Sequence, residues 1–154
     1  MKSTVLKFGF YGLIVGFIIF FIHLFFGIDN LDYSTNEILG YLSIFLSLSF
    51  IFFGIKHYRD KENDGFISLG KAIQIGVLIA FLVGLGIAFA DFIYTIFIDP
   101  SFFANYEQQL IDQGKEDEIV KMTSTTAALF MLILVTIIGF IISLISGIIL
   151  QRKK

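Results

Sequence analysis

Cysteine and tryptophan are absent from this sequence of 154 residues, and proline occurs only once. Without cysteine, the chain can form neither a disulfide nor a thiolate metal site. The two histidines, His23 and His57, lie too far apart for the ligand spacing of a zinc site. No glycine-rich loop follows a strand, so the sequence gives no basis for a phosphate-binding loop. Neither Ser43 nor Ser47 has a His or Lys base at the same depth in the membrane, which argues against a serine nucleophile. We therefore expect no cofactor, no metal site and no enzymatic activity.

Charged residues are also scarce, at 16%, and are largely excluded from four long apolar runs. These runs cover residues 8–28, 38–55, 72–98 and 127–150, in a chain that is 56% hydrophobic with a mean hydropathy of +0.87. A soluble domain of this length has too few polar positions to coat them, whereas each bilayer crossing requires about 20 helical residues. The sequence predicts an all-α polytopic membrane protein, with one four-transmembrane-helix bundle over residues 1–154.

The first apolar run is expected to be a retained helix and not a cleaved signal peptide. Lys2 and Lys7 would suit the basic start of a signal peptide. However, the run is longer than the apolar core of a signal, and no small-residue cleavage site follows it before Asp29. We therefore count this run as the first of the four spans.

Basic residues are sorted to one side of the four spans. Of the 11 Lys and Arg, only Lys115 and Lys121 lie in the first or third connection, and these connections hold most of the acidic residues. Because positively charged loops stay in the cytoplasm, both termini and the second connection are predicted to be cytoplasmic. The acidic outer side gives no support for nucleic-acid binding. The expected partner is the lipid bilayer, with a homo-oligomer or a membrane-protein partner left open.

Turn and cap signals describe the first two connections. The short polar connection at residues 29–37 predicts an antiparallel hairpin of the first two spans. The second connection, residues 56–71, is called the inner connection because it is predicted to be cytoplasmic. Its Asn63-Asp64-Gly65 predicts a turn, because glycine accepts a positive φ and Asn or Asp side chains bond the local backbone. Ser68 predicts an N-cap for the third span.

The third connection predicts a short amphipathic helix at about residues 100–113. Asp99 and Pro100 fit an N-cap followed by proline at the first helical position, and Gly114 fits a C-terminal stop. This helix is expected either on the outer surface of the membrane or folded onto the end of the bundle.

Two ionisable residues interrupt the apolar runs, His23 in the first span and Asp91 in the third. At about 100° per residue, both fall on the faces that carry small residues, and both lie in the outer half of the membrane. We therefore predict that the two side chains approach each other, directly or through Tyr94 or water. One interpretation is a buried polar pair that fixes helix register; the other is a proton relay or cation site.

Small residues recur at a spacing of four in the spans, which predicts close helix packing in lipid. Each set falls on one face of its helix, so the four spans are expected to close into one bundle. The predicted packing residues are Gly12, Gly16, Gly76, Ala80, Gly84, Ala88, Gly139, Ser143 and Gly147.

Residues 54–76, GIKHYRDKENDGFISLGKAIQIG, resemble the segment between spans two and three of an uncharacterised bacterial family, domain of unknown function 4199. The four-span layout and the Asp99-Pro100 helix start also agree. The family occurs mainly in Bacteroidota, so the resemblance implies a multi-pass protein of a bacterial inner (cytoplasmic) membrane and implies no chemistry. The matching residues of the inner loop include Tyr58, Arg59, Asp60, Gly65, Ser68 and Lys71.

Two functions from different classes fit these features. The first is a structural or accessory component of a membrane assembly, which packs with itself or with a partner. The alternative is a small transporter or an ion- or proton-coupled permease that uses the His23/Asp91 pair. A wide aqueous cavity that reaches Asp91 would favour transport, and a bundle sealed by its small residues would favour the structural role.

Overall fold

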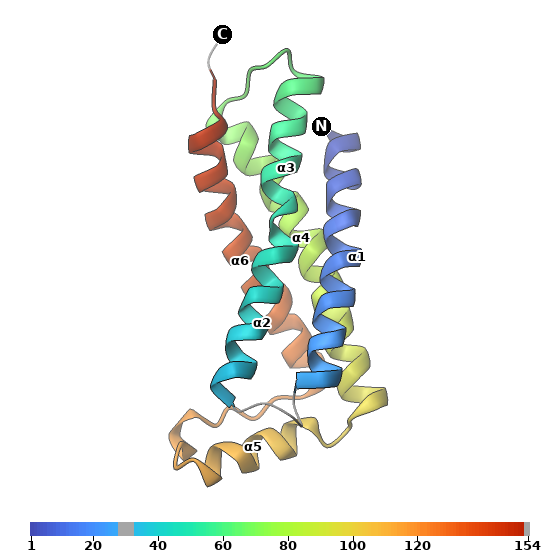
Figure 1. Cartoon of the computed structure of the whole chain (residues 1–154), viewed down its shortest axis with the longest axis vertical. Coiled ribbons are helices and arrows are strands. Elements are labelled where there is room, and N and C mark those ends of the chain that lie inside the picture. Colours follow the sequence, from blue (N-terminus) through green and yellow to red (C-terminus); the bar gives the residue numbers. More distant parts are fainter. Residues whose placement is uncertain (28–32, 153–154) are drawn as a thin grey trace.

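The computed structural model describes residues 1–27 and 33–152, and it consists of long helices packed side by side (Figure 1). Both ends of the chain lie at one end of the bundle, together with the connection that precedes α4 (Leu69–Ile93). The short helix α5 (Phe102–Asp112) lies across the opposite end. The remaining elements are α1 (Lys2–Gly27), α2 (Tyr33–Leu48), α3 (Phe50–His57), η1 (Tyr58–Glu62), η2 (Tyr94–Ile98), η3 (Glu116–Glu118) and α6 (Ser124–Leu150).

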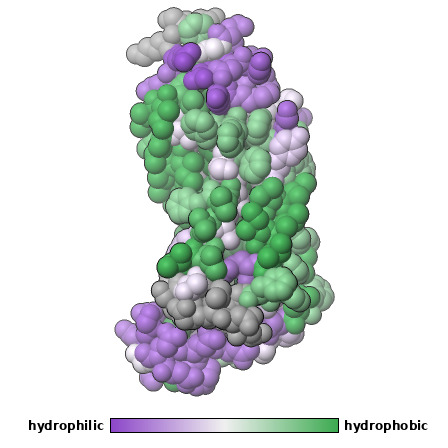
Figure 2. All heavy atoms as spheres, in the orientation of Figure 1, coloured by the Kyte–Doolittle hydropathy of each residue, from purple (hydrophilic) through white to green (hydrophobic). Residues whose placement is uncertain are grey.

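Four of the helical segments in the described residues are long and apolar enough to cross a membrane, as the sequence predicts. Figure 2 shows their apolar surface as a broad band between two polar ends. On α1, the large side chains exposed on this band include Phe10, Ile14, Ile18 and Ile22, which recur every four residues. Apolar side chains that point outward require a lipid solvent. The four segments are Lys2–Phe26, Ile38–Glu62, Leu69–Ile98 and Ser124–Leu150.

The core of the bundle is centred on α4, which packs against both α1 and α6. Its side chains Ile75, Ile79, Val83 and Ile87 are fully buried. These residues repeat at intervals of four, so they form one continuous stripe along the helix. The third span is therefore the most enclosed of the four, whereas the others keep a wide face toward the surroundings.

The second span differs from the single helix expected at residues 38–55. It begins at Tyr33, is interrupted at Ser49, and continues to Glu62 through a π-helical turn. Ser47 Oγ donates to the Ser43 carbonyl (2.8 Å), and Ser49 Oγ donates to the Leu46 carbonyl (2.7 Å). Serine side chains that bond the preceding turn compete with the backbone ladder and bend helices, which accounts for the interruption.

The predicted turn and cap of the inner connection are present. Asp64 and Gly65 have φ values of 51° and 83°, and the Asn63 side chain donates to the Phe66 carbonyl at 2.6 Å. Ser68 is the N-cap of α4, since its side chain accepts from the backbone N–H of Lys71. The predicted first outer connection falls partly on residues 28–32, which lie outside the described residues.

The start of α5 differs from the prediction by two residues. Ser101, and not Asp99, occupies the N-cap position. Asp99 Oδ1 instead accepts from the Ser101 backbone N–H (3.1 Å) and from its hydroxyl (2.6 Å), so the carboxylate holds the turn before the helix. Gly114, with φ of 69°, ends the helix in a Schellman motif in which Lys115 N–H donates to the Leu110 carbonyl.

The helix α5 is folded onto the end of the bundle (Figure 1). Its Leu110 side chain is only 1% exposed, and the Phe102 ring meets the Tyr94 ring edge-on at 6.0 Å. The start of α5 therefore contacts η2 at the end of the third span, and its placement on the outer surface of the membrane stays a prediction. After it, α6 begins with a capping box between Thr123 and Thr126.

Candidate functional site

A cavity of about 310 Å³ opens between α1, α2 and α6 at the end of the bundle that α5 covers. Its inner wall is apolar and includes Phe20, Leu24 and Ile44, which are at most 5% exposed. At its rim, Tyr41 of α2 and Phe130 of α6 are about half exposed. The cavity is therefore enclosed on the side of the bundle core, and Tyr41 and Phe130 lie on its exposed side.

The helix α5 supplies most of the polar lining of this cavity. Phe102, Asn105, Tyr106 and Gln109 all line it, and their spacing of three and four residues places them on one helix face. The Phe102 and Tyr106 rings stack with centroids 6.4 Å apart. This side of the cavity thus presents two amides and an aromatic pair. Asn105 and Gln109 are absent from the residues predicted from sequence, although their spacing with Phe102 and Tyr106 indicates a shared face.

His23 lies in the wall of the same cavity. Its ring is half-buried and tilted against Phe20, with centroids 6.0 Å apart. Its Nε2 atom points toward α2, because a Cβ built on Gly40 would lie 3.5 Å from that atom. The glycine therefore leaves space beside the imidazole, a role that sequence patterning alone did not assign to it.

Asp91 lies on α4 and is only 6% exposed. Its Oδ2 atom has no hydrogen-bond partner among the described residues, whereas its backbone carbonyl accepts from Thr95 Oγ1 at 2.9 Å. Tyr94 follows three residues later, with its ring edge-on to Phe21 at 6.3 Å. Asp91 is not among the described residues that line the cavity beside His23.

The direct form of the predicted His23–Asp91 pair is not present. No hydrogen bond or ion pair joins the two side chains in the part of the chain that the structure describes. The ring of His23 is turned toward the gap at Gly40, which helical periodicity on α1 alone cannot specify. A shared polar network through Tyr94 or water stays a prediction.

The small residues of α4 and α6 lie where the two helices approach most closely. A Cβ built on Gly76 would be 2.9 Å from Ile51 Cγ2 and closer still to Ser143, and one built on Gly147 would be 2.8 Å from Leu69 Cδ1. Ser143 is fully buried and donates its hydroxyl to the Gly139 carbonyl (2.5 Å). Two further contacts lie at the same interface: Gly139 with Ala80, and Gly84 with Leu132 and Thr136. Ala88, the last predicted packing residue of α4, is 8% exposed.

The small residues of α1 lie against α4 and the second span. A Cβ on Gly12 would be 2.5 Å from Val83 Cγ2, and one on Gly16 would be 3.2 Å from Ile87 Cγ1. The closest approach to a neighbouring backbone on this side is at Gly86, where an added Cβ would be 3.0 Å from the Leu13 carbonyl carbon and nearer to its oxygen. Gly86 is absent from the predicted packing residues, because it lies on the other face from Gly84 and Ala88.

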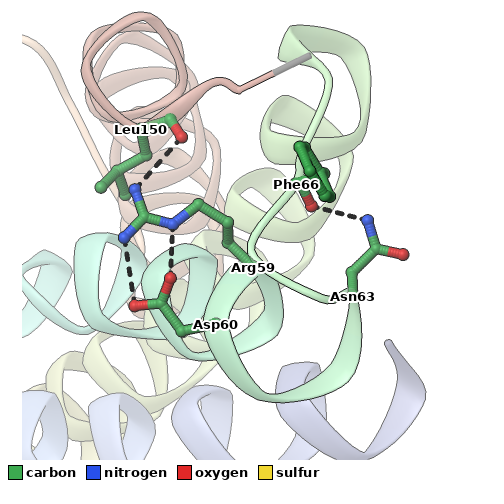
Figure 3. Close-up of polar contacts among 5 residues, drawn as sticks. All are labelled: Arg59, Asp60, Asn63, Phe66 and Leu150. Carbon is green, nitrogen blue, oxygen red and sulfur yellow. Dashed lines mark hydrogen bonds and ion pairs between the residues drawn. The ribbon is translucent and has the colours of Figure 1, made fainter. Parts of the chain in front are cut away.

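Arg59 ties the inner connection to the end of α6 (Figure 3). Its guanidinium donates to both carboxylate oxygens of Asp60, at 2.6 and 3.1 Å, and to the Leu150 carbonyl at 3.3 Å. The Arg59 side chain is 9% exposed. A cation at a helix C-terminus satisfies a carbonyl that has no intrahelical partner and also favours the helix dipole.

A short backbone pairing completes this contact. Ile67 and Arg152 exchange two backbone hydrogen bonds, at 3.1 and 3.0 Å, and the Ile67 side chain is buried. We call the Arg59–Asp60–Leu150 contact and the Ile67–Arg152 pairing the inner clasp. The other residues quoted for the family resemblance lie nearby: Tyr58 is half-buried against the core, and Lys71 Nζ donates to Gln74 Oε1 at 3.2 Å.

The fold and its apolar band define an integral membrane protein of the four-span helical class. A family model described as Protein of unknown function (DUF4199) matches residues 7–152. The chain therefore belongs to that family, in agreement with the resemblance at the inner connection. No curated protein and no solved structure matches the chain.

Proposed function

We propose that this protein is a non-enzymatic accessory component of a bacterial cytoplasmic membrane, and that it acts by packing with itself or with a membrane-protein partner. The observation that carries the proposal is the close contact of α4 with helices on both sides. Gly76 and Gly139 close the interface with α6, and Gly86 closes the interface with α1. Helices that touch at glycine leave no room for an aqueous path between them.

The proposed orientation has both termini and the inner clasp in the cytoplasm. The end of the bundle that holds the termini also holds most of the basic residues. In α5 and the segment after it, most of the charged residues are acidic. Positively charged connections are retained on the cytoplasmic side during insertion. The outward faces of α1 and α6 then remain for lipid or for a partner.

The accessory role is tested by the mass of the native assembly. Extraction from native membranes with a styrene–maleic acid copolymer, followed by native mass spectrometry, is expected to find the 17.4 kDa chain within a larger complex of constant composition. Alanine at Ile18 and Ile22 of α1, which are about half exposed on the face left for lipid or for a partner, tests whether the complex forms through α1. A chain found only as a monomer with lipid would contradict the proposal.

Transport is the second candidate, and buried Asp91 favours it. An unpaired intramembrane carboxylate is costly, by about 2.5–3.5 kcal/mol at a helix centre, and such groups often mark ion pathways. We expect proton flux into proteoliposomes, followed with an entrapped pH dye, to be equally low for the native chain and for Asp91→Asn. Flux in the native chain that Asp91→Asn abolishes would establish transport instead.

A further inference from the structure

We propose that the cavity beside His23 binds an uncharged amphipathic lipid, with a hydroxyl or carbonyl head group at α5 and an apolar chain against α1 and α2. This site goes beyond the accessory role and does not depend on it. The volume of about 310 Å³ lies within the range of about 300–1,000 Å³ that is typical of ligand pockets. Such pockets combine apolar walls with a few convergent polar groups.

The walls select an apolar chain that enters from the bilayer. Phe20, Leu24 and Ile44 form a buried apolar floor, whereas Tyr41 and Phe130 are exposed at the rim. The rim residues come from α2 and α6, both of which belong to membrane-spanning segments. A ligand dissolved in the membrane therefore reaches the cavity sideways between these helices, without passing through water.

The polar groups select an uncharged head. Asn105 and Gln109 of α5 provide amide donors and acceptors, and His23 of α1 provides an imidazole. None of the described lining residues is Lys, Arg, Asp or Glu. The hydroxyl and carbonyl oxygens of an uncharged head group match the amide donors and acceptors of Asn105 and Gln109.

Gly40 provides the variant that fills this cavity. The only described atom within 4 Å of a Cβ at Gly40 is His23 Nε2, at 3.5 Å, which is an ordinary contact. Leucine at this position therefore extends into the cavity without a backbone clash, and leucine is a better helix former than glycine. Gly70 supplies a matched control, because nothing lies within 4 Å of its added Cβ and it lies at the start of α4.

The experiment uses the full chain in phosphatidylcholine nanodiscs and a diazirine-bearing monoacylglycerol as the uncharged probe. We expect photolabelling, mapped by peptide mass spectrometry, to concentrate on α5 and on α6 around Phe130. Because the leucine side chain occupies space that the ligand needs, labelling is expected to fall about tenfold in Gly40→Leu, and Gly70→Leu is expected to label like the native chain. Unlabelled monoacylglycerol should compete with the probe, and phosphatidylglycerol should not.

A second variant separates loss of binding from loss of fold. Gln109→Leu changes an exposed position and removes one hydrogen-bonding group, so labelling is expected to fall about fivefold with an unchanged melting temperature. Labelling spread evenly over the lipid-facing segments, or unaffected by both variants, would overturn the site. Equal competition by phosphatidylglycerol would overturn the uncharged head group.

Discussion

Single glycine residues determine how closely α1 and α4 approach each other. At Gly86 the neighbour of an added Cβ is the backbone of Leu13, which cannot rotate away as a side chain can. At Gly9, by contrast, the nearest atom is the flexible end of Leu82. The position of a glycine within the bundle therefore matters more than its membership of a small-residue pattern.

Gly86→Ala is predicted to destabilise the bundle, because the methyl group forces α1 and α4 apart. Overpacking of this kind costs about 1–3 kcal/mol. Gly70→Ala, on the same helix but in open space, should instead stabilise the protein by about 0.5–1 kcal/mol, since alanine favours the helix. Thermal unfolding in detergent measures both variants, and equal melting temperatures would refute the close contact at Gly86.

The inner clasp connects whole elements of the fold. It joins three segments of the chain: η1, Ile67 just before α4, and the end of α6. Arg59 is buried although it is charged, because it is paired with Asp60 and bonded to a helix-terminal carbonyl. The residues that carry the family resemblance in this connection thus have a structural role in the fold.

Arg59→Ala is predicted to loosen the end of α6. Hydrogen bonds made by a charged group contribute about 1.5–3 kcal/mol, and their loss should speed amide exchange at Gln151 and Arg152, whose N–H groups bond Gly147 and Ile67. The control is Lys61→Ala at an exposed position of the same turn, with an expected effect within about 0.5 kcal/mol. Hydrogen–deuterium exchange measures both, and unchanged exchange in Arg59→Ala would exclude the clasp as a stabilising contact.

Sequence reasoning succeeded for elements that depend on local signals. Hydropathy identified the four spans, Ser68 identified a cap, and Gly65 and Gly114 identified two chain reversals with positive φ. It failed where neighbours in space decide the outcome. The inner clasp and the cavity beside Gly40 each require distant segments to meet, which periodicity within one segment does not specify. The interruption at Ser49 is local, but hydropathy does not register the serine side-chain bonds that bend the helix.

The orientation of the whole molecule connects these features. If the basic end is cytoplasmic, the inner clasp faces the cytoplasm, and α5 and the cavity beside His23 face the outside. The apolar band between the two polar ends requires the bundle to cross the bilayer (Figure 2). The positive-inside rule predicts that the basic end is retained in the cytoplasm.

Single-cysteine labelling tests this orientation most directly, because the chain has no cysteine of its own. Ala104 of α5 and Lys61 of the inner connection are both exposed, so each accepts a cysteine without a packing defect. In intact spheroplasts, a membrane-impermeant maleimide is predicted to label Ala104→Cys, and to label Lys61→Cys only after lysis. Labelling of Lys61→Cys in intact spheroplasts, or of both variants from the same side, would contradict the account.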